Sequence, residues 1–470
     1  MTPIREIPDL ARESANSTEV PVTALTADQW KAALETLDPA TRAAAVLAGF
    51  SGKARQLALI GDEAGGLARV LFGLGDTPRA EMFRDLAGRL PTGAYRLEGT
   101  PGGVPGESVG VAFALGAYRF DRYRKVTHPP RLSAPAGADS AEIVRVSHAL
   151  NLARDMINTG ANDMGPLQVE TISREIAEAH GARIEVTTGD ALLDANYPAV
   201  HAVGRAAAPH RAPRMIEISW TGPGAGEKAP LVAVIGKGVV FDSGGLDIKS
   251  TAGMRQMKKD MGGAAHALAL GRMIMAARLP VRLAILTPAV ENAISGDAMR
   301  PGDVIASRKG LTIEVGNTDA EGRLILADAL TRAGELEPDL TLDLATLTGA
   351  ARVALGPDLP PFYTDDEALA GEILAASSKA GDPVWRMPLW RGYEAAIDSD
   401  VADVTNEADA WAQAGSITAA LFLKRFAPAT GAWAHFDIFA WNPRGRPGWP
   451  KGAEAQAIRA LYALIRDRYS

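Results

Sequence analysis

The sequence predicts a two-domain α/β protein, with a smaller N-terminal α/β domain and a larger C-terminal domain built on a mostly parallel, mixed sheet flanked by helices. A chain of 470 residues is too long for a single hydrophobic core. The segment 126–140 is rich in Pro, Ala, Gly and Ser and has no periodicity, which is typical of a linker. Beyond it, nearly continuous apolar runs alternate with amphipathic segments, as strands and helices of an α/β sheet do.

The N-terminal domain is expected over residues 1–139, including the linker. Its hydrophobic pattern predicts helices over 28–49 and 78–90 and strands over 55–62 and 110–120.

The C-terminal domain is expected over residues 140–470. Ligands of such sheets bind outside the carboxyl ends of the strands, so polar residues at those ends are candidates for a site. The pattern predicts helices over 140–158, 167–180, 262–279 and 322–336, and strands over 182–188, 230–236, 281–290 and 340–347.

Composition narrows the classes of function. The net charge of −7 gives no general attraction to nucleic acid or to anionic membranes. The absence of cysteine excludes disulfides, thiolate nucleophiles and Cys-zinc sites. Residues 1–14 have no apolar core of a secretory signal, and no apolar run is long enough to cross a bilayer, so we expect a cytoplasmic protein.

Several catalytic motifs are missing from the sequence. No two of the seven histidines are three or four residues apart, so an H-E-x-x-H zinc site is excluded. There is no P-loop and no G-x-G-x-x-G fingerprint. The chemistry of an enzyme with this sequence would therefore depend on carboxylates, Lys and Arg.

Four acids lie near the carboxyl ends of predicted strands or at helix starts: Asp242, Asp260, Asp319 and Glu321. Each acid at a helix start could simply cap it. If all four converge, their charge of about −4 is most simply balanced by two divalent cations. Lys237, at the end of an apolar strand, could join the ligands as a neutral amine, because nearby cations would lower its pKa.

Three features of this region also have purely structural interpretations. The Gly-rich segment 232–250 could be a strand-to-loop turn with solvated charges, and Asp260 could cap the helix that follows. His266 lies among alanines in that helix and is interpreted as a core histidine.

Five segments resemble the leucyl (cytosol) aminopeptidase family of dinuclear metallopeptidases. The resemblance covers about residues 140–470, while the first 140 residues are only loosely similar to the variable N-terminal domain of the family. The segments are NTDAEGRL (317–324), GKGVVFDSGG (236–245), MKKDMGGAA (257–265), ATLTGA (345–350) and the looser ARDMINTGANDMGP (153–166).

The resemblance implies two metal sites in a catalytic domain. Lys237, Asp242, Asp260 and Glu321 would hold one metal, and Asp242, Asp319 and Glu321 the other, with Asp319 also offering its backbone carbonyl. The metals would be Mn or Zn, and a hydroxide bridging them would attack the peptide carbonyl.

The resemblance also implies roles around the metals. Lys249 would lie beside the scissile carbonyl, and Arg323 would hold a bicarbonate ion that shuttles protons. Met257, Thr346 and Gly349 match positions around the first side chain of the substrate.

The activity implied is release of N-terminal residues, with a leucine-like preference, from peptides with a free N-terminus by a homohexamer. Two alternatives stay open: a DNA-binding or architectural role, as some relatives have, and another two-metal hydrolase such as a phosphoesterase. The chain departs from the family at Asp247, where a small polar residue is common, and at Lys259, where an aromatic residue is frequent.

Overall fold

The computed structural model describes residues 19–408 and 413–470. The expectation about a secretory signal falls on residues 1–14, outside the described residues. The described chain divides into two compact units. The first comprises the residues up to Asn151 together with Asn442–Lys451, and the second comprises Leu152–Trp441 and Gly452–Ser470. Because the division falls after Asn151, helix α5 (Ser140–Asn158) contributes to both units.

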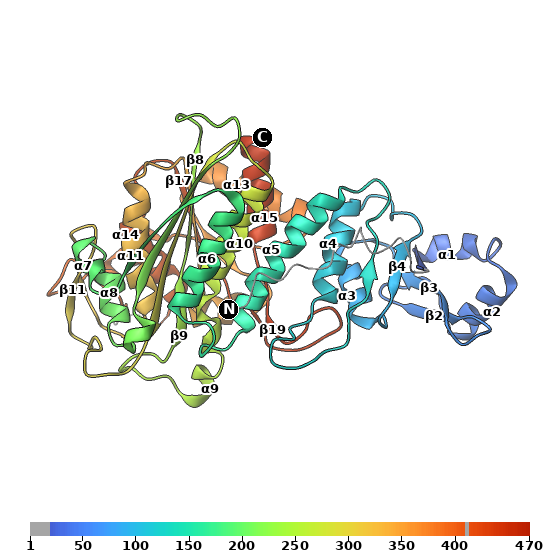
Figure 1. Cartoon of the computed structure of the whole chain (residues 1–470), viewed down its shortest axis with the longest axis horizontal. Helices are drawn as coiled ribbons and strands as arrows, with labels where there is room; N and C mark the ends of the chain where they lie inside the picture. Colours follow the sequence, from blue (N-terminus) through green and yellow to red (C-terminus); the bar gives the residue numbers. More distant parts are fainter. Residues whose placement is uncertain (1–18, 409–412) are drawn as a thin grey trace. The chain divides into compact units, whose positions relative to one another are not determined.

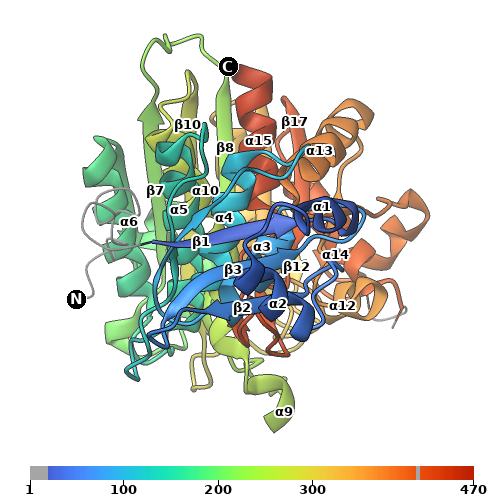
Figure 2. The ribbon, with the colours of Figure 1, turned by 90° about the vertical axis from the view of Figure 1, so that its right-hand side faces the viewer.

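The first unit is built on a five-stranded sheet in the order β2-β3-β1-β4-β5. Strand β1 is parallel to both β3 and β4, and β2 is antiparallel to β3; Figure 2 shows β1, β2 and β3 side by side. The elements are β1 (Val20–Leu25), α1 (Ala27–Ala33), α2 (Pro39–Leu47), β2 (Leu57–Gly61), β3 (Leu67–Gly73), α3 (Glu81–Arg89), β4 (Ala94–Leu97), α4 (Gly106–Ala117) and β5 (Arg131–Leu132).

The strand predicted over 110–120 is wrong, because this segment lies in helix α4. The helix is apolar almost all round and buries most of its residues, so no polar face reveals its period. Its glycines permit close packing on α3: a Cβ on Gly116 would lie 2.1 Å from the carbonyl oxygen of Arg84.

The helix predicted over 28–49 is two helices. Asp38 accepts a hydrogen bond from the Thr41 N–H and Pro39 occupies the first turn, so a new helix begins there.

The second unit contains a nine-stranded sheet in the order β15-β14-β17-β13-β8-β10-β7-β6, with β9 paired to β10. Figure 1 labels β8, β9 and β17 of this sheet. Its strands are β6 (Arg183–Thr188), β7 (Arg214–Thr221), β8 (Leu231–Gly236), β9 (Gly238–Asp242), β10 (Arg282–Asn292), β13 (Leu340–Ala345), β14 (Pro361–Tyr363), β15 (Trp385–Arg386) and β17 (Ala432–Asp437). A smaller sheet joins β11 (Val304–Ala306), β12 (Thr312–Glu314) and β16 (Val404–Thr405), while β18 (Trp441–Asn442) pairs with β19 (Gly452–Ala453).

The helices confirm most of the predicted pattern, and the predicted fold class is confirmed. The predicted helices 140–158, 167–180, 262–279 and 322–336 correspond to α5, α6, α10 and α11. The helices are α6 (Pro166–His180), α7 (Ala191–Asp194), α8 (Pro198–Gly204), α9 (Thr251–Met254), α10 (Gly262–Ala276), α11 (Glu321–Gly334), α12 (Gly349–Leu355), α13 (Glu367–Ala380), α14 (Gly415–Phe426) and α15 (Ile458–Tyr469), with 3₁₀ helices at Pro209–Arg211, Met257–Met261 and Arg391–Ile397.

The central strands carry the candidate residues to one edge of the sheet. Strands β8, β10, β13 and β17 are parallel, and β9 is parallel to β10. In this register Asp242 pairs with Asn292, and Ala345 pairs with Asp437. The carboxyl ends of these strands therefore meet where α/β sheets bind ligands.

Helices cover both faces of this sheet. On one face α10 packs on β8, β10 and β13, and Gly271 of α10 lies against Ile285 of β10. On the other, α11 packs on β8 and β10 in one cluster with Ala284 and Leu286. Among the described residues, no helix combines the length and the apolar character needed to cross a membrane.

Candidate metal centre

The segment before α11 carries two of the candidate carboxylates, and a buried asparagine fixes its shape. Asn406, after β16, accepts hydrogen bonds at Oδ1 from the N–H groups of Gly316 and Asn317, at 2.8 and 3.2 Å. Its Nδ2 donates to the carbonyls of Asn317 and Ala320. These hydrogen bonds hold the backbone that presents Asp319 and Glu321.

The capping interpretation of the acids is not supported. Helix α11 has Ala320 at its N-cap and α10 has Met261, and neither helix has a side-chain hydrogen bond at its cap. Asp260 lies instead in the 3₁₀ helix before α10. Side-chain capping of α10 and α11 therefore does not explain why these acids are present.

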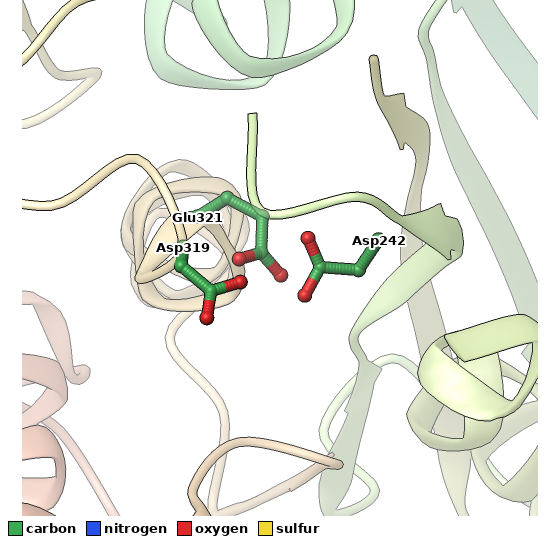
Figure 3. Close-up of side chains that lie close together, drawn as sticks. All are labelled: Asp242, Asp319 and Glu321. Atoms are coloured by element: carbon green, nitrogen blue, oxygen red, sulfur yellow. The ribbon is translucent and has the colours of Figure 1, made fainter. Parts of the chain in front are cut away.

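Three carboxylates converge at the carboxyl edge of the sheet. One oxygen each of Asp242, Asp319 and Glu321 lies within 4.8 Å of the others. Figure 3 shows Asp319 and Glu321, from the start of α11, facing Asp242 at the end of β9. Asp242 and Glu321 are buried, and Asp319 is partly exposed.

Asp260 joins this cluster through Lys237. The Nζ of Lys237 lies 2.7 Å from Oδ2 of Asp260 and 2.9 Å from Oε1 of Glu321. The absence of a side chain at Gly322 makes room for this lysine, since a Cβ there would lie 2.5 Å from Cε of Lys237. Lys237 therefore lies between Asp260 and Glu321, the two acids that the resemblance groups with it around one metal.

Lys249 lies on the other side of the cluster. Its Nζ is 2.7 Å from Oδ2 of Asp242 and also forms an ion pair with Asp319. Five candidate ligands and Lys249 are thus brought together, although they come from four separate segments of the chain.

The lysines near the cluster do not fully offset the negative charge of its carboxylates. Burial, and then the charge of Asp242, raise the pKa of Glu321 to about 8, and the same causes raise the pKa of Asp319 to about 6. Burial by itself lowers the pKa of Lys237, but Asp260, Glu321 and Asp242 outweigh it and raise that pKa. The expected fall in the pKa of Lys237 therefore requires the cations themselves.

The residues fit a pair of divalent cations. Oε2 of Glu321 is buried without a hydrogen-bond partner among the described residues. Oε1 of Glu321 and Oδ2 of Asp260 are also buried, and their charged partner is the Lys237 ammonium that they share. Buried carboxylate oxygens of this kind are costly unless a cation or donor satisfies them. Carboxylates with one neutral amine are a donor set suited to Mn or Zn.

Arg323 lies beside this centre on α11. Burial lowers its pKa to about 10, which the charges of Glu321, Asp437 and Glu407 partly offset, so the guanidinium remains charged near neutral pH. Its Nε is buried without a hydrogen-bond partner among the described residues. A half-buried cation with a buried, unused donor fits a small anion.

Two of the three residues assigned to the first side chain of a substrate, Met257 and Thr346, lie near Asp260. Met257 begins the 3₁₀ helix that contains Asp260, and the Thr346 hydroxyl donates to Oδ1 of Asp260 at 2.8 Å. Gly349 opens α12 and is exposed. The intervening loop is held by Asp437, which accepts hydrogen bonds from the N–H groups of Leu347 and Thr348.

Asp247, one of the two positions where the chain departs from the family, supports the segment before α11: its Oδ2 accepts a hydrogen bond from the Thr318 N–H at 2.7 Å. His266 is a core histidine, as interpreted, since Nδ1 contacts the carbonyl of Gly262 and Nε2 accepts from the N–H of Gln456.

Sequence reasoning missed three supporting residues: Asn292, Asn406 and Asp437. Asn292 donates to Oδ1 of Asp242 and to the carbonyl of Thr318. Asn292 and Asp437 end strands β10 and β17, and Asn406 directly follows β16. A polar residue at the end of a buried strand was the signal that could have identified them.

Residues 151–462 match the cytosol aminopeptidase family, catalytic domain, and residues 20–134 match the M17 aminopeptidase, N-terminal domain. A probable cytosol aminopeptidase of Syntrophotalea carbinolica is 39% identical over 81% of this chain and 79% of its own length.

Two solved structures extend the comparison. The cytosol aminopeptidase of Coxiella burnetii superposes with a TM-score of 0.90 and 43% identity, covering 96% of this chain and 98% of that one. The bottromycin maturation enzyme BotP in complex with Mn has a TM-score of 0.85 and 32% identity, covering 96% of this chain and all of that one.

Proposed function

The chain belongs to the cytosol aminopeptidase family and is a metallopeptidase of that kind, and on this premise we propose how it acts and on what. It releases the N-terminal residue, leucine-like residues included, from peptides with a free N-terminus. The observation that carries this proposal is the convergence of Asp242, Asp319 and Glu321, with Oε2 of Glu321 buried and without a hydrogen-bond partner among the described residues.

Lys237, Asp242, Asp260 and Glu321 would hold one divalent ion, and Asp242, Asp319 and Glu321 the other. When bound, the two ions would fix the substrate amine and supply a hydroxide nucleophile, formed from a water shared between them, at neutral pH. Manganese is supported by the Mn complex of BotP, and the donor set equally suits zinc.

Lys249 and Arg323 would stabilise negative charge and assist proton transfer. Lys249, held by Asp242 and Asp319, carries an ammonium that can donate to the oxygen on which negative charge develops. Arg323 would bind a bicarbonate, whose oxygens can accept a proton from the nucleophile and return it to the departing amine.

We further propose a cytoplasmic location and a homohexameric assembly, with no membrane or nucleic-acid partner. The name cytosol aminopeptidase of the relatives supports the location. Light scattering of the purified protein tests the assembly.

A panel of aminoacyl anilides and dipeptides tests the activity. Hydrolysis should stop after chelation and return with Mn or Zn, and dipeptides with an acetylated N-terminus should not be cleaved. Activity that survives exhaustive chelation, or no cleavage of any substrate with a free amine, would show that the proposal is wrong.

A further inference from the structure

One aromatic ring beside the residues assigned to the first side chain of the substrate is flanked by two cations. Phe439 follows β17, and its ring centroid lies 4.6 Å from Cζ of Arg352 and 5.5 Å from Nζ of Lys259. Lys259 lies in the same 3₁₀ helix as Met257, and Arg352 lies in the same helix as Gly349. The cations are therefore built into the elements that would surround that side chain.

Two contacts hold Arg352 in place. Its guanidinium lies over the ring of Phe439, and its Nη1 donates to the carbonyl of Thr348 at 3.1 Å. A Cβ on Gly349 would lie 3.5 Å from Nη2, so this group lies near the exposed Gly349. A guanidinium held in this way, with Nη2 near that glycine, is preorganised to bind an acceptor such as a carboxylate.

Lys259 lies against the same ring but contributes less charge than Arg352. It is 2% exposed, and its Nζ lies 3.4 Å from Oδ1 of Asp260. Burial lowers the pKa of Lys259, and the charge of Asp260 offsets this only in part. The cation that could meet a substrate group is therefore Arg352.

Among the residues that the structure describes, Arg352 forms no ion pair with Asp or Glu. The hydrogen bond to Thr348 occupies one Nη only. A partly buried cation without a protein counter-ion, beside a substrate-binding segment, favours an anionic group on the substrate.

We infer that this chain accepts N-terminal glutamate and aspartate in addition to leucine-like residues, and that Arg352, stacked on Phe439, is the residue that determines this specificity. The inference rests on the proposed aminopeptidase function and deepens it by naming a class of substrate.

The first test compares glutamyl and leucyl anilides with the metal-loaded enzyme. We expect kcat/KM for the glutamyl substrate within about tenfold of that for the leucyl substrate, because a charged hydrogen bond offsets the apolar burial that leucine gains. Calorimetric titration with free L-glutamate and L-leucine gives a readout that does not depend on catalysis.

The second test uses Arg352→Met, which keeps an apolar side chain against Phe439, and Arg352→Lys, which keeps the charge. Arg352→Met should lower the glutamyl-to-leucyl ratio of kcat/KM by about tenfold or more, since it removes one charged hydrogen bond. Arg352→Lys should retain part of that ratio. Arg425→Met, which removes an exposed positive charge at the end of α14, is the matched control and should leave the ratio unchanged.

The outcomes separate the inference from the proposed function. Good leucyl hydrolysis with no measurable glutamyl hydrolysis or glutamate binding overturns the inference alone. An equal fall for both substrates in Arg352→Met assigns Arg352 to anchoring α12 and also overturns it. If no free-amine substrate is cleaved, the proposed function is wrong, and a glutamate affinity that Arg352→Met abolishes would still support the assigned binding site.

Discussion

Lys237 reaches the carboxylates by passing over a residue that has no side chain. Its Cδ, Cε and Nζ all lie within 2.6 Å of the position that a Cβ on Gly322 would occupy. The backbone at Gly322 is ordinary helix, so the glycine serves the neighbouring lysine rather than a special conformation. This is why Gly follows Glu321 in the sequence.

Gly322→Ala tests this arrangement. The methyl group should displace the end of Lys237 and lower metal affinity by about 10- to 100-fold, as loss of a supporting interaction at a metal site typically does. Metal titration followed by calorimetry measures the change.

Gly371→Ala is the matched control, because it makes the same change inside α13 with nothing within 4 Å of the new Cβ. Unchanged metal affinity in Gly322→Ala would contradict the role given to this glycine.

Glu321→Gln removes the charge of the carboxylate assigned to both metals. We expect a loss in kcat/KM of at least about 1,000-fold, because the bridging charge supports both ions. Glu335→Gln, at the C-cap of the same helix, should leave activity intact. Circular dichroism checks folding, and retained activity in a folded Glu321→Gln variant would exclude the two-metal site.

At the scale of elements, strands β13 and β17 are joined by a buried ion pair as well as by backbone pairing. His435 pairs in register with Asp343, and its Nδ1 lies 2.5 Å from Oδ1 of that residue. The other carboxylate oxygen accepts from Nε1 of Trp433 at 2.8 Å. Burial lowers the pKa of His435, but the charge of Asp343 outweighs burial, and the pKa is raised overall.

This pair makes stability depend on pH. Because the pKa of His435 is raised on folding, its stabilising contribution is complete below about pH 6.5 and is lost as the pH rises through the folded value. His435→Gln keeps a donor for Asp343 but cannot titrate in this range.

The difference in unfolding midpoint between wild type and His435→Gln should therefore shrink as the pH rises above about 6.5. Thermal unfolding of the two metal-free proteins from pH 5.5 to 8.5 measures it. A difference that is constant over this range, or that grows with pH, would contradict the assignment.

The elements also show why one prediction failed. Helix α5 was predicted over its observed bounds, because its apolar residues recur at helical spacing among charged ones. Helix α4 was predicted as a strand, because a segment covered on all sides has no polar face. Whether such a run is strand or helix is decided by what packs on it, here α3.

At the scale of the whole molecule, a net charge of −7 includes acids packed together at the end of one sheet. Their repulsion opposes folding unless cations offset it. Folding and metal binding should therefore be coupled.

Divalent metal should raise the unfolding temperature. A free metal concentration of 100 times the dissociation constant stabilises the folded state by about 2.7 kcal/mol per site. Differential scanning calorimetry of the chelated and the Mn-loaded protein measures the shift. Glu321→Gln should show a smaller shift, whereas equal shifts in both proteins would place the bound metal elsewhere.

The sequence by itself determined the class of fold, the segments that carry the acids and the family to which they belong. It could do so because apolar periodicity and short motifs are local properties of the chain. Only the tertiary structure decided that Lys237 lies between Asp260 and Glu321, that Asn406 shapes the segment before α11, and that Arg352 stacks on Phe439. These contacts join segments far apart in the chain, so they depend on strand register and side-chain direction, which only packing of the whole domain fixes.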